Sequence, residues 1–352
     1  MTSTQAAEDI LVSVVIPAYN AVTTLAETLR SVFAQTYRPI EIVVVDDGST
    51  DDTWALLQSF GIAVRAIHQV NSGIGIARNT GVNAARGAYI ALLDADDLCE
   101  PERIAVELHF LQTHPDILLC SSDFSGFDQN GPLQASYCGV YYTRCSESRG
   151  GARARYPEHE LLDIAAFLPV PVAEPLRVPV HYGRVYEELT QGNFIHPPTV
   201  MFRREAVALA GPFDPAIKIA CEWEWFVRVA RVGCFGFIDR PLLRYRRSPT
   251  QISSDPRTPL DSLAVAHKIH ALDPALRQRE PGMVNRHFGA LSLDAADALS
   301  EVKPWQSLRL LLASLVCYRT LKGRSLRTLF KIIMPKFLLG PLRRLRLRLP
   351  LL

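Results

Sequence analysis

The amino-acid sequence predicts an α/β fold: a doubly wound, mostly parallel β-sheet flanked by helices, followed by a helical C-terminal extension with a basic end. Over the first 115 residues, short β-branched runs alternate with amphipathic helical segments, and strands joined by crossover helices form parallel sheets. The chain has 352 residues, of which 48% are apolar and 21% charged. It can therefore bury a large core, and neither a disordered chain nor a collagen-like fibre is expected.

The first strands and helices follow one another without interruption. Residues 12–16 are a β-branched run, typical of a strand buried on both faces, and Pro17 stops it. Residues 23–35 carry apolar side chains at helical spacing. Residues 40–45 form a second apolar strand that ends at two aspartates, and a short helix over 54–60 follows.

The alternation then continues through two more strands. Residues 63–68 form the third strand, and Gly87 ends a helix that begins at residue 75. The apolar residues 89–93 form the fourth strand, and Pro101 suits the first turn of a helix that runs to residue 113.

The second half of the chain is less regular. Between residues 124 and 191, many Pro, Gly, Arg and Tyr residues and little periodicity predict an insertion of loops and short elements. A short strand, two helices and a longer helical region are expected at 199–202, 204–210, 222–231 and 260–320.

Charge is unevenly distributed along the sequence. The net charge is +2, yet residues from 302 onward include twelve Lys/Arg and no Asp/Glu, so the first 301 residues carry a net charge of −10. The acidic body argues against a nucleic-acid-binding core, and the basic, Leu-rich tail points to an anionic surface.

The tail has an amphipathic pattern. Apolar residues recur at helical spacing, and Pro335 and Pro341 predict two short pieces rather than one long helix. Cations alternate with leucines over 343–349, which favours reversible attachment to an anionic membrane surface. Packing of the tail on the acidic body or on a second subunit is the alternative. The apolar residues are Leu326, Leu329, Phe330, Ile333 and Phe337.

The cysteines and the N-terminus predict a cytoplasmic protein. The seven cysteines are odd in number and form no CxxC pair, which favours free thiols in a reducing compartment. No basic segment followed by an apolar one opens the sequence, and no uncharged apolar run reaches about 18 residues. Neither a secretion signal nor an ordinary membrane span is therefore expected.

Three polar clusters follow the ends of predicted strands, at residues 17–20, 46–49 and 94–97. Ligands of open parallel sheets bind beyond the carboxyl ends of the strands. The last cluster holds three aspartates, which repel one another unless a cation or protons intervene, and oxygen ligands favour Mg²⁺ or Mn²⁺. An acidic turn that caps the next helix explains this cluster equally well.

The first two clusters limit the kind of ligand. Asp51 or Thr50 can cap the helix that follows residue 53, which leaves Asp47 free to accept a hydrogen bond from a nucleobase. The first strand ends in Pro-Ala-Tyr-Asn rather than in the GxGxxG of dinucleotide-binding folds. This difference argues against a nicotinamide or flavin enzyme.

With these motifs in order, the chain resembles the family 2 glycosyltransferases, nucleotide-diphosphosugar transferases of the GT-A fold. The match is dense from residue 11 to about 115, resumes near residue 196 and fades beyond about residue 253. The residues that carry it are 12–20, 35–37, 44–51, Gly73, 77–79, 87–90, 93–97, Pro101, 196–203 and 211–214.

The resemblance implies a nucleotide site at the first two clusters. Pro17, Ala18 and Tyr19 would line the pocket for the base and ribose, with Tyr19 stacking on the base. Asp47 would bind the edge of the base, and Asp46 would support the same site.

The resemblance also implies a metal and donor-sugar site. Arg78 would lie near the nucleotide and its diphosphate. Asp94 and Asp96 would form the DxD pair for Mg²⁺ or Mn²⁺, with Asp96 the direct ligand and Asp94 nearer the ribose. Asp97 would lie close to the donor sugar.

The catalytic base is implied at Glu222. Family members usually have an acidic pair followed by Trp, whereas here Cys221 replaces the first acid and Glu222 stands where an Asp is expected. Glu224 is the rival, but two residues apart on a helix the two side chains point to different faces. A solvated pair of acids beside Arg228 is the alternative without catalysis.

Two further features are left open. His196 stands in a stretch that the family places near the acceptor, although a lone histidine is more often structural. The basic cluster at 244–247 either holds the diphosphate or forms a solvated edge.

The function expected is metal-dependent, inverting transfer of a sugar from a UDP- or dTDP-sugar to a hydroxyl acceptor, a free or lipid-linked sugar, in cell-surface polysaccharide or glycan synthesis. A non-catalytic, membrane-attached protein that binds sugar nucleotides is the alternative. A nucleotidyl- or phosphotransferase would need a Gly-rich phosphate loop with Lys, which the sequence lacks. The QxxRW signature of processive relatives is also missing, which favours transfer of single sugars.

We expect a glycosyltransferase domain over 1–255 and a helical extension over 256–352. Within the first, a nucleotide-binding half (11–123) precedes an insertion that selects the acceptor (124–195) and the part that carries the base (196–255). The expected location is the cytoplasm, with peripheral binding to the inner face of the plasma membrane.

Overall fold

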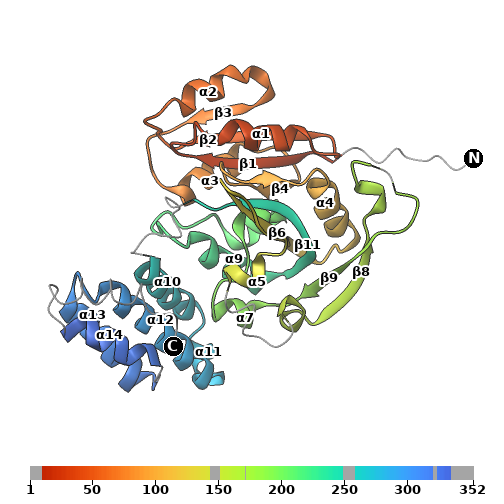
Figure 1. Cartoon of the computed structure of the whole chain (residues 1–352). Coiled ribbons are helices and arrows are strands. Elements are labelled where there is room, and N and C mark those ends of the chain that lie inside the picture. Colours follow the sequence, from red (N-terminus) through yellow and green to blue (C-terminus); the bar gives the residue numbers. More distant parts are fainter. Residues whose placement is uncertain (1–9, 143–150, 171, 249–257, 320–322, 334–352) are drawn as a thin grey trace, which may run out of the picture. The chain divides into compact units, whose positions relative to one another are not determined.

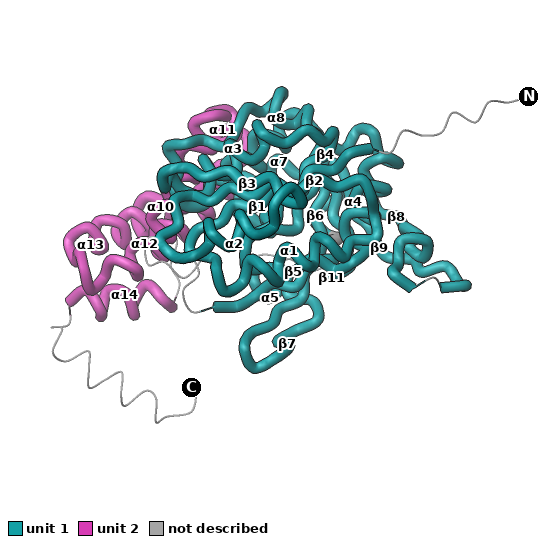
Figure 2. The backbone as a smooth tube through the Cα atoms, turned by 90° about the horizontal axis from the view of Figure 1, so that it is seen from above, with its two compact units in different colours: residues 1–249 teal, residues 250–352 magenta. Residues whose placement is uncertain are grey.

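A computed structural model describes residues 10–142, 151–170, 172–248, 258–319 and 323–333. The chain divides into two compact units, residues 1–249 and 250–352, which Figure 2 colours separately.

Unit 1 is built on one mixed β-sheet (Figure 1). Its main path runs in the order β3 (Arg65–His68), β2 (Ile40–Asp46), β1 (Val12–Ala18), β4 (Tyr89–Leu92), β10 (Met201–Arg203), β6 (Ile117–Asp128), β11 (Cys234–Arg246), β9 (Arg177–Gly183) and β8 (Glu158–Asp163). The short strands β5 (Leu98–Cys99) and β7 (Gly131–Gln134) pair with β11 and β6.

Most strands of the sheet point the same way. β1 is parallel to β2 and to β4, and β2 is parallel to β3. β10 is antiparallel to both β4 and β6, while β6 and β11 are parallel. The predicted α/β class with a mostly parallel sheet is therefore confirmed.

Helices cover the sheet. Every residue of β1 is buried, as expected of a strand with helices on both faces. The helices of unit 1 are α1 (Leu25–Phe33), α2 (Thr53–Ser59), α3 (Ile74–Ala84), α4 (Arg103–Thr113), α5 (Cys138–Tyr141), α7 (Tyr186–Thr190), α8 (Glu205–Ala210) and α9 (Cys221–Val232). Single helical turns add Gly61–Ala63, Gly151–Arg155, Ala165–Phe167 and Pro197–Thr199.

Helix α3 packs unusually close to the sheet. A Cβ on Gly81 would lie 2.4 Å from Cγ1 of Val15 in β1 and 3.3 Å from Cγ2 of Val45 in β2. Only a glycine allows this approach, which fixes the helix that carries Arg78 one turn earlier.

The predicted insertion at 124–191 was wrong in part. β6 continues through Phe124 to Asp128, and β8 and β9 extend the sheet at its edge. β9 alternates buried and exposed residues, with Val178 and Val180 inside, but its Pro179 and the acidic composition of β8 hide the strand pattern.

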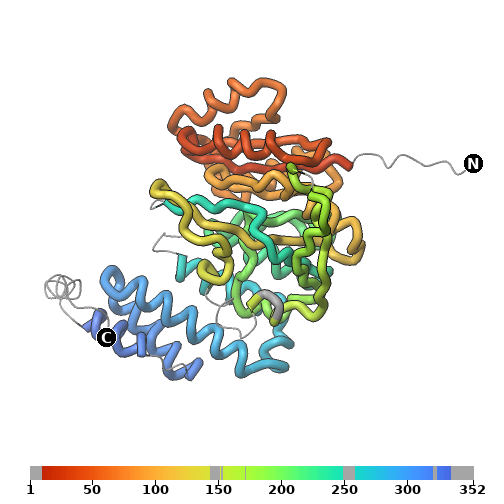
Figure 3. The backbone as a smooth tube through the Cα atoms, turned by 45° about the vertical axis from the view of Figure 1, so that its right-hand side comes forward, coloured from red at the N-terminus to blue at the C-terminus, as the bar shows by residue number. Residues whose placement is uncertain are grey.

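Unit 2 is helical, as predicted for residues 260–320. Its helices are α10 (Thr258–Leu272), α11 (Pro274–Arg279), α12 (Pro281–Leu299), α13 (Pro304–Leu312), the π-turn Ala313–Cys317 and α14 (Gly323–Ile333), shown in blue in Figure 3. No helix among the described residues is long and apolar enough to cross a bilayer. The predicted cation–leucine alternation at 343–349, Phe337, Pro335 and Pro341 lie outside the described residues.

Candidate active site

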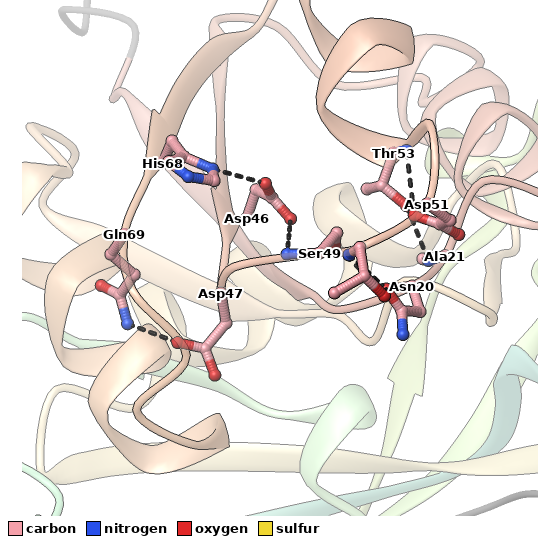
Figure 4. Close-up of polar contacts among 10 residues, drawn as sticks. Asn20, Ala21, Asp46, Asp47, Ser49, Asp51, Thr53, His68 and Gln69 are labelled. Atoms are coloured by element: carbon pink, nitrogen blue, oxygen red, sulfur yellow. Dashed lines mark hydrogen bonds and ion pairs between the residues drawn. The ribbon is translucent and has the colours of Figure 1, made fainter.

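The turn after β2 is held by buried carboxylates (Figure 4). Asp46 is fully buried; its Oδ2 lies 2.7 Å from Nδ1 of His68, and its Oδ1 accepts a hydrogen bond from the backbone N–H of Ser49 at 3.2 Å. Asp51 accepts the N–H of Thr53, the first residue of α2, at 3.0 Å. Asp51 therefore satisfies a free N–H at the start of the helix. The sequence alone left open whether Asp51 or Thr50 has this capping role.

Asp47 is not free, contrary to the sequence prediction. Its side chain is buried, and it accepts hydrogen bonds from Nε2 of Gln69 at 2.7 Å and from the N–H groups of Ser72 and Gly73 at 2.9 and 2.8 Å. Two of these donors use Oδ1 and one uses Oδ2, so one acceptor position remains on Oδ2. The loop 69–73 was missed because two of its three donors are backbone N–H groups, which leave no signature in the sequence. The glycine at position 73, which has a φ of 97° in the structure, is a weak sequence signal of this turn.

The end of β1 lies beside this turn. Pro17 and Ala18 are buried, and Tyr19 is 51% exposed. Asn20 receives a hydrogen bond on its Oδ1 from the N–H of Thr50 at 2.8 Å and donates its own N–H to Oγ of Ser49 at 2.9 Å. The two strand ends are thus tied together, and the ring of Tyr19 remains accessible.

The acidic loop Asp94–Asp97 follows β4. Its peptide is oriented by α1, because the hydroxyls of Thr24 and Thr28 both donate to the carbonyl of Ala95, at 2.9 and 3.0 Å. The N–H of Asp97 donates to the carbonyl of Asp94 at 3.2 Å. The loop is therefore a fixed turn that presents three carboxyl groups.

The carboxyl groups of this loop resist ionisation. Burial, reinforced by the neighbouring Asp94, raises the pKa of Asp96 to about 6. Burial and the charges of Asp96 and Asp94 raise the pKa of Asp97 well above its ordinary value. Burial also raises the pKa of Asp94, although Arg78 opposes the effect. Such a crowded set stores charge repulsion that a cation would relieve.

Arg246 at the end of β11 braces the loop from the other side. Its backbone N–H donates to Oδ1 of Asp97 at 2.9 Å, and its Nε donates to the carbonyl of Asp96 at 2.8 Å. Its guanidinium also pairs with Glu27 on α1 at 2.5 Å. Of the basic cluster 244–247, this residue is thus bound to the loop rather than solvated, a role that its place 150 residues downstream concealed.

Arg78 joins the acidic loop to α9. Its side chain is 1% exposed; one guanidinium nitrogen lies 2.8 Å from Oδ1 of Asp94, and the other is bonded to Oε1 of Glu222. Burial opposes its charge, yet Glu222 and Asp94 raise the pKa of Arg78. Side chains from α3, the loop after β4 and α9 therefore meet at one buried cation.

The two acids of α9 have different partners. Glu224 is fully buried and forms two bonds of 2.9 Å with Arg228 one turn later. Glu222 instead faces Arg78, and its side chain is 12% exposed. Burial would raise the pKa of Glu222, but Arg78 and hydrogen bonds, including one from the Cys221 thiol, keep it below the ordinary value. Glu222 is thus an ionised carboxylate, and the two acids are not a solvated pair.

A second buried cation lies next to the acidic loop, and it was not identified from the sequence. Arg103 on α4 is fully buried; it pairs with Glu107 at 3.0 Å and donates to the carbonyl of Leu92, the last residue of β4, at 3.0 Å. Burial raises the pKa of Glu107 to about 7 despite the arginine beside it. The i, i+4 spacing of the pair is a visible sequence signal, but it gives no indication of burial.

His196 belongs to an aromatic cluster. Its ring stacks on Phe124 at 4.1 Å between centroids, and its Nδ1 lies 3.3 Å from the hydroxyl of Tyr142. Burial, with the charges of Arg103 and Arg78, lowers the pKa of His196 to about 3. It is a neutral, buried imidazole, packed as a structural histidine would be.

The donor atoms at the acidic loop fit a hard divalent cation only in part. Within the described residues, no group of three His, Cys, Asp or Glu side chains is arranged to hold a metal ion. Asp96, however, is a half-buried carboxyl with a raised pKa, and Arg78 takes only Oδ1 of Asp94. One or two carboxylates suit Mg²⁺ or Mn²⁺ when substrate phosphates supply further ligands.

Comparison with known proteins relates the chain to enzymes that transfer sugars. Residues 13–152 match the family model described as Glycosyl transferase family 2. An uncharacterized glycosyltransferase of Rickettsia typhi is 27% identical over 246 residues, which are 69% of this chain and 66% of that protein. The Escherichia coli UDP-Glc:alpha-D-GlcNAc-diphosphoundecaprenol beta-1,3-glucosyltransferase WfaP is 42% identical over 106 residues, 29% of this chain and 42% of that protein. The chain thus spans at most about two thirds of these relatives.

A solved structure shares the fold. The mannosyltransferase PcManGT from Pyrobaculum calidifontis, in complex with GDP-Man and Mn²⁺, matches with a TM-score of 0.53 and 17% sequence identity, over 92% of this chain and 87% of that chain. At this identity the likeness concerns the fold alone, and it confirms the GT-A architecture that the sequence predicted.

Proposed function

The chain belongs to glycosyltransferase family 2 through its N-terminal domain, and from this premise we propose that it is a metal-dependent inverting glycosyltransferase, which moves a sugar from a UDP- or dTDP-sugar to a hydroxyl group. The observation that carries the proposal is the meeting of Asp94 and Glu222 at Arg78. A protein that only bound nucleotides would not need the carboxylate of Glu222 beside the acidic loop.

The donor would bind along the ends of β1, β2 and β4. The exposed ring of Tyr19 would stack on the base, with Pro17 and Ala18 lining the pocket for the base and ribose, and the remaining acceptor position of Asp47 would take a base N–H. Asp46 would hold the turn through His68. Asp94 would lie near the ribose and Asp97 near the donor sugar.

Mg²⁺ or Mn²⁺ would be held by Asp96, with Asp94 as a second ligand. When bound, the ion would neutralise the negative charge that grows on the departing diphosphate. Arg78 would contribute a fixed positive charge beside the same group.

Glu222 would act as the catalytic base. It is ionised at neutral pH and 12% exposed, so it can accept the proton of an acceptor hydroxyl within hydrogen-bond reach. Attack by that hydroxyl on the anomeric carbon, on the face opposite to the leaving diphosphate, would invert the configuration in one displacement. The Arg78 contact would have to loosen as the proton arrives, because protonated Glu222 no longer pairs with a cation.

The acceptor and the location are proposed by analogy with one relative. The Escherichia coli relative acts on a diphosphoundecaprenol-linked GlcNAc, and we propose a sugar on a lipid diphosphate as acceptor here. Such an acceptor would be used at the inner face of the plasma membrane, in polysaccharide or glycan synthesis. The region 124–195 would select it.

The test is a screen of sugar nucleotides with the full chain. UDP- and dTDP-sugars are incubated with a short lipid-diphosphate GlcNAc acceptor and Mn²⁺, Mg²⁺ or EDTA, and the product is detected by mass spectrometry and its anomeric configuration by NMR. We expect transfer with a metal and none with EDTA. Glu222→Gln should lower transfer by about 10²-fold or more while nucleotide binding is kept, whereas Asp96→Asn should lose transfer and metal-dependent binding.

Glu205→Gln is the matched control, because this acid of α8 has a 59% exposed side chain and should be neutral. Transfer that persists in Glu222→Gln would contradict the base assignment. Tight nucleotide binding with every donor and no transfer with any acceptor would instead favour the non-catalytic binding protein.

A further inference from the structure

Unit 2 has a well-packed inner layer. Leu293 and Ala296 of α12 form a buried cluster with Leu311 of α13, and Leu329 and Ile332 of α14 pack against it. α13 and α14 also contact each other. Each of these two helices therefore has one face that is fixed on the cluster and another that points away from it.

The outward face of α14 is apolar. Leu326, Phe330 and Ile333 are 70%, 49% and 72% exposed. They are spaced by four and three residues, so they form one stripe along the helix. The apolar residues at helical spacing in the sequence therefore have two different environments. Leu329 packs against the buried cluster, while Leu326, Phe330 and Ile333 are exposed.

The outward face of α13 and its π-turn has the same character. Trp305, Leu312 and Val316 are 80%, 49% and 70% exposed. Ser307, Leu311 and Ser314, on the opposite face, are buried. The helix therefore already has one packed face, and the exposed apolar residues are not needed for the core of unit 2.

All charged residues of α13 and α14 are basic. No Asp or Glu follows Glu301 in the sequence. Arg324 and Lys331 are tied to Asp294 and Asp297 of α12, at 3.0 and 2.8 Å. Arg309 and Arg327 are exposed, and neither pairs with an acid in the described part of the chain.

We propose that the outer faces of α13 and α14 are a docking surface for an anionic lipid bilayer. Trp305, Phe330 and the aliphatic residues beside them would enter the boundary between headgroups and acyl chains, and Arg309 and Arg327 would pair with lipid phosphates. This proposal goes beyond the transfer reaction and does not depend on it. It concerns a surface of unit 2 alone, and it requires no spanning helix.

The basic charge and the apolar side chains of this surface together indicate which partner fits it. A second copy would bring the same basic face, and the tail after residue 333 is also basic, with no acidic residue, so both would be repelled. A nucleic acid would satisfy the arginines but not six exposed apolar side chains. An anionic bilayer satisfies both.

The test is flotation of the full chain with vesicles. The vesicles contain phosphatidylcholine alone or with 30% phosphatidylglycerol, at about 0.1 M salt. We compare the natural chain with the variant Trp305→Ser/Phe330→Ser/Ile333→Ser and with Arg309→Gln/Arg327→Gln. We expect binding that requires phosphatidylglycerol, with partition lowered at least tenfold by the apolar variant and about tenfold or more by the arginine variant.

The controls change equally exposed residues elsewhere. Ile62→Ser/Leu209→Ser removes two apolar side chains of unit 1 that are 108% and 57% exposed, and Arg30→Gln/Arg65→Gln removes two exposed arginines of unit 1. Both should bind vesicles as the natural chain does. All variants should keep their circular dichroism spectrum and their activity on a water-soluble acceptor.

Three outcomes would overturn the proposal. Vesicle binding that is unchanged in both test variants would assign attachment to another part of the chain. A dimer in size-exclusion chromatography that the apolar variant dissociates would make the face a contact between copies. A short duplex RNA or DNA that binds more tightly than the vesicles would make the partner a nucleic acid.

Discussion

Removing the Arg78 charge is the sharpest test of the site, because one buried cation holds two carboxylates from different segments. Arg78→Met keeps most of the side-chain volume and deletes the ion pairs with Asp94 and Glu222. Each charge-assisted hydrogen bond contributes about 1.5–3 kcal/mol, and removing one partner of a buried ion pair costs about 3–5 kcal/mol. Since the side chain of Asp94 is 29% exposed, water can solvate it, and we expect the lower end, about 3 kcal/mol.

The assay is urea unfolding followed by tryptophan fluorescence. Trp223 and Trp225 are buried on α9, beside Glu222, so they report on this unit. A double-mutant cycle with Glu222→Gln and Arg78→Met/Glu222→Gln isolates the pair, and we expect a coupling energy of about 1.5 kcal/mol or more. Arg30→Met, at an exposed position of α1, is the control and should change the free energy of unfolding by less than about 0.5 kcal/mol.

A loss below about 1 kcal/mol in Arg78→Met, together with additive single and double variants, would refute the reasoning. It would mean that the two carboxylates do not share this cation in solution. The same variant should lose sugar transfer, since the acidic loop and the base would no longer be held at a fixed distance.

Three further predictions concern residues around the site. The folded state keeps His196 neutral, with a pKa of about 3, whereas the same histidine in the unfolded chain takes up a proton near pH 6.5. The free energy of unfolding should therefore fall by about 2 kcal/mol between pH 7 and pH 5 on account of this residue. In urea unfolding at the two pH values, His196→Phe should show a fall that is smaller by this amount. Gly81→Ala should cost about 1–3 kcal/mol in thermal or urea unfolding, because the new methyl group would overlap Val15, while Gly139→Ala, with no atom nearby, should not destabilise. Asp47→Asn should weaken UDP or dTDP binding in calorimetry at least tenfold, since an amide has a single oxygen and cannot accept the hydrogen bonds that the two carboxylate oxygens of Asp47 accept; unchanged affinity would exclude Asp47 from the nucleotide site.

The first hundred residues could be predicted well because each element satisfies its own rule. The β-branched run 12–16 lies in the fully buried strand β1, and the helix expected over 75–86 is α3, which ends two residues earlier, at Ala84. The observed strands and helices differ from the predicted ones there by at most two residues at their ends.

The edge strands could not be predicted in the same way. β8 and β9 gain their stability from pairing with β11, a contact between distant segments, and their exposed faces admit Pro, His and acids. Periodicity reports burial on one face of an element, so a strand that is half exposed at the edge of a sheet gives a weak signal.

The same difference between local patterns and contacts of distant segments applies to the site. The position after a buried strand singled out Asp94 and Asp96, and the family resemblance singled out Glu222. No spacing rule could pair Glu222 with Arg78, 144 residues away. It also could not reveal that Asp47 is already bonded by the loop 69–73. Two of those bonds come from backbone N–H groups, which every residue except proline carries, and the third comes from the side chain of Gln69, 22 residues along the chain, so no local pattern in the sequence marks them.

These hidden contacts also bear on how the site works. Asp47, Asp97 and Glu222 are each restrained by donors that belong to other segments: a loop after β3, the end of β11 and helix α3. A carboxylate restrained in this way needs little reorganisation when a substrate arrives, which is where preorganised sites gain their rate. The restraint on Glu222 would have a cost if Glu222 acts as the proposed base, because the Arg78 cation that keeps the carboxylate ionised also lowers its affinity for a proton. In the proposed reaction, an acceptor hydroxyl would therefore compete with Arg78 for Glu222, and the site would be most active when the donor diphosphate draws the Arg78 guanidinium away.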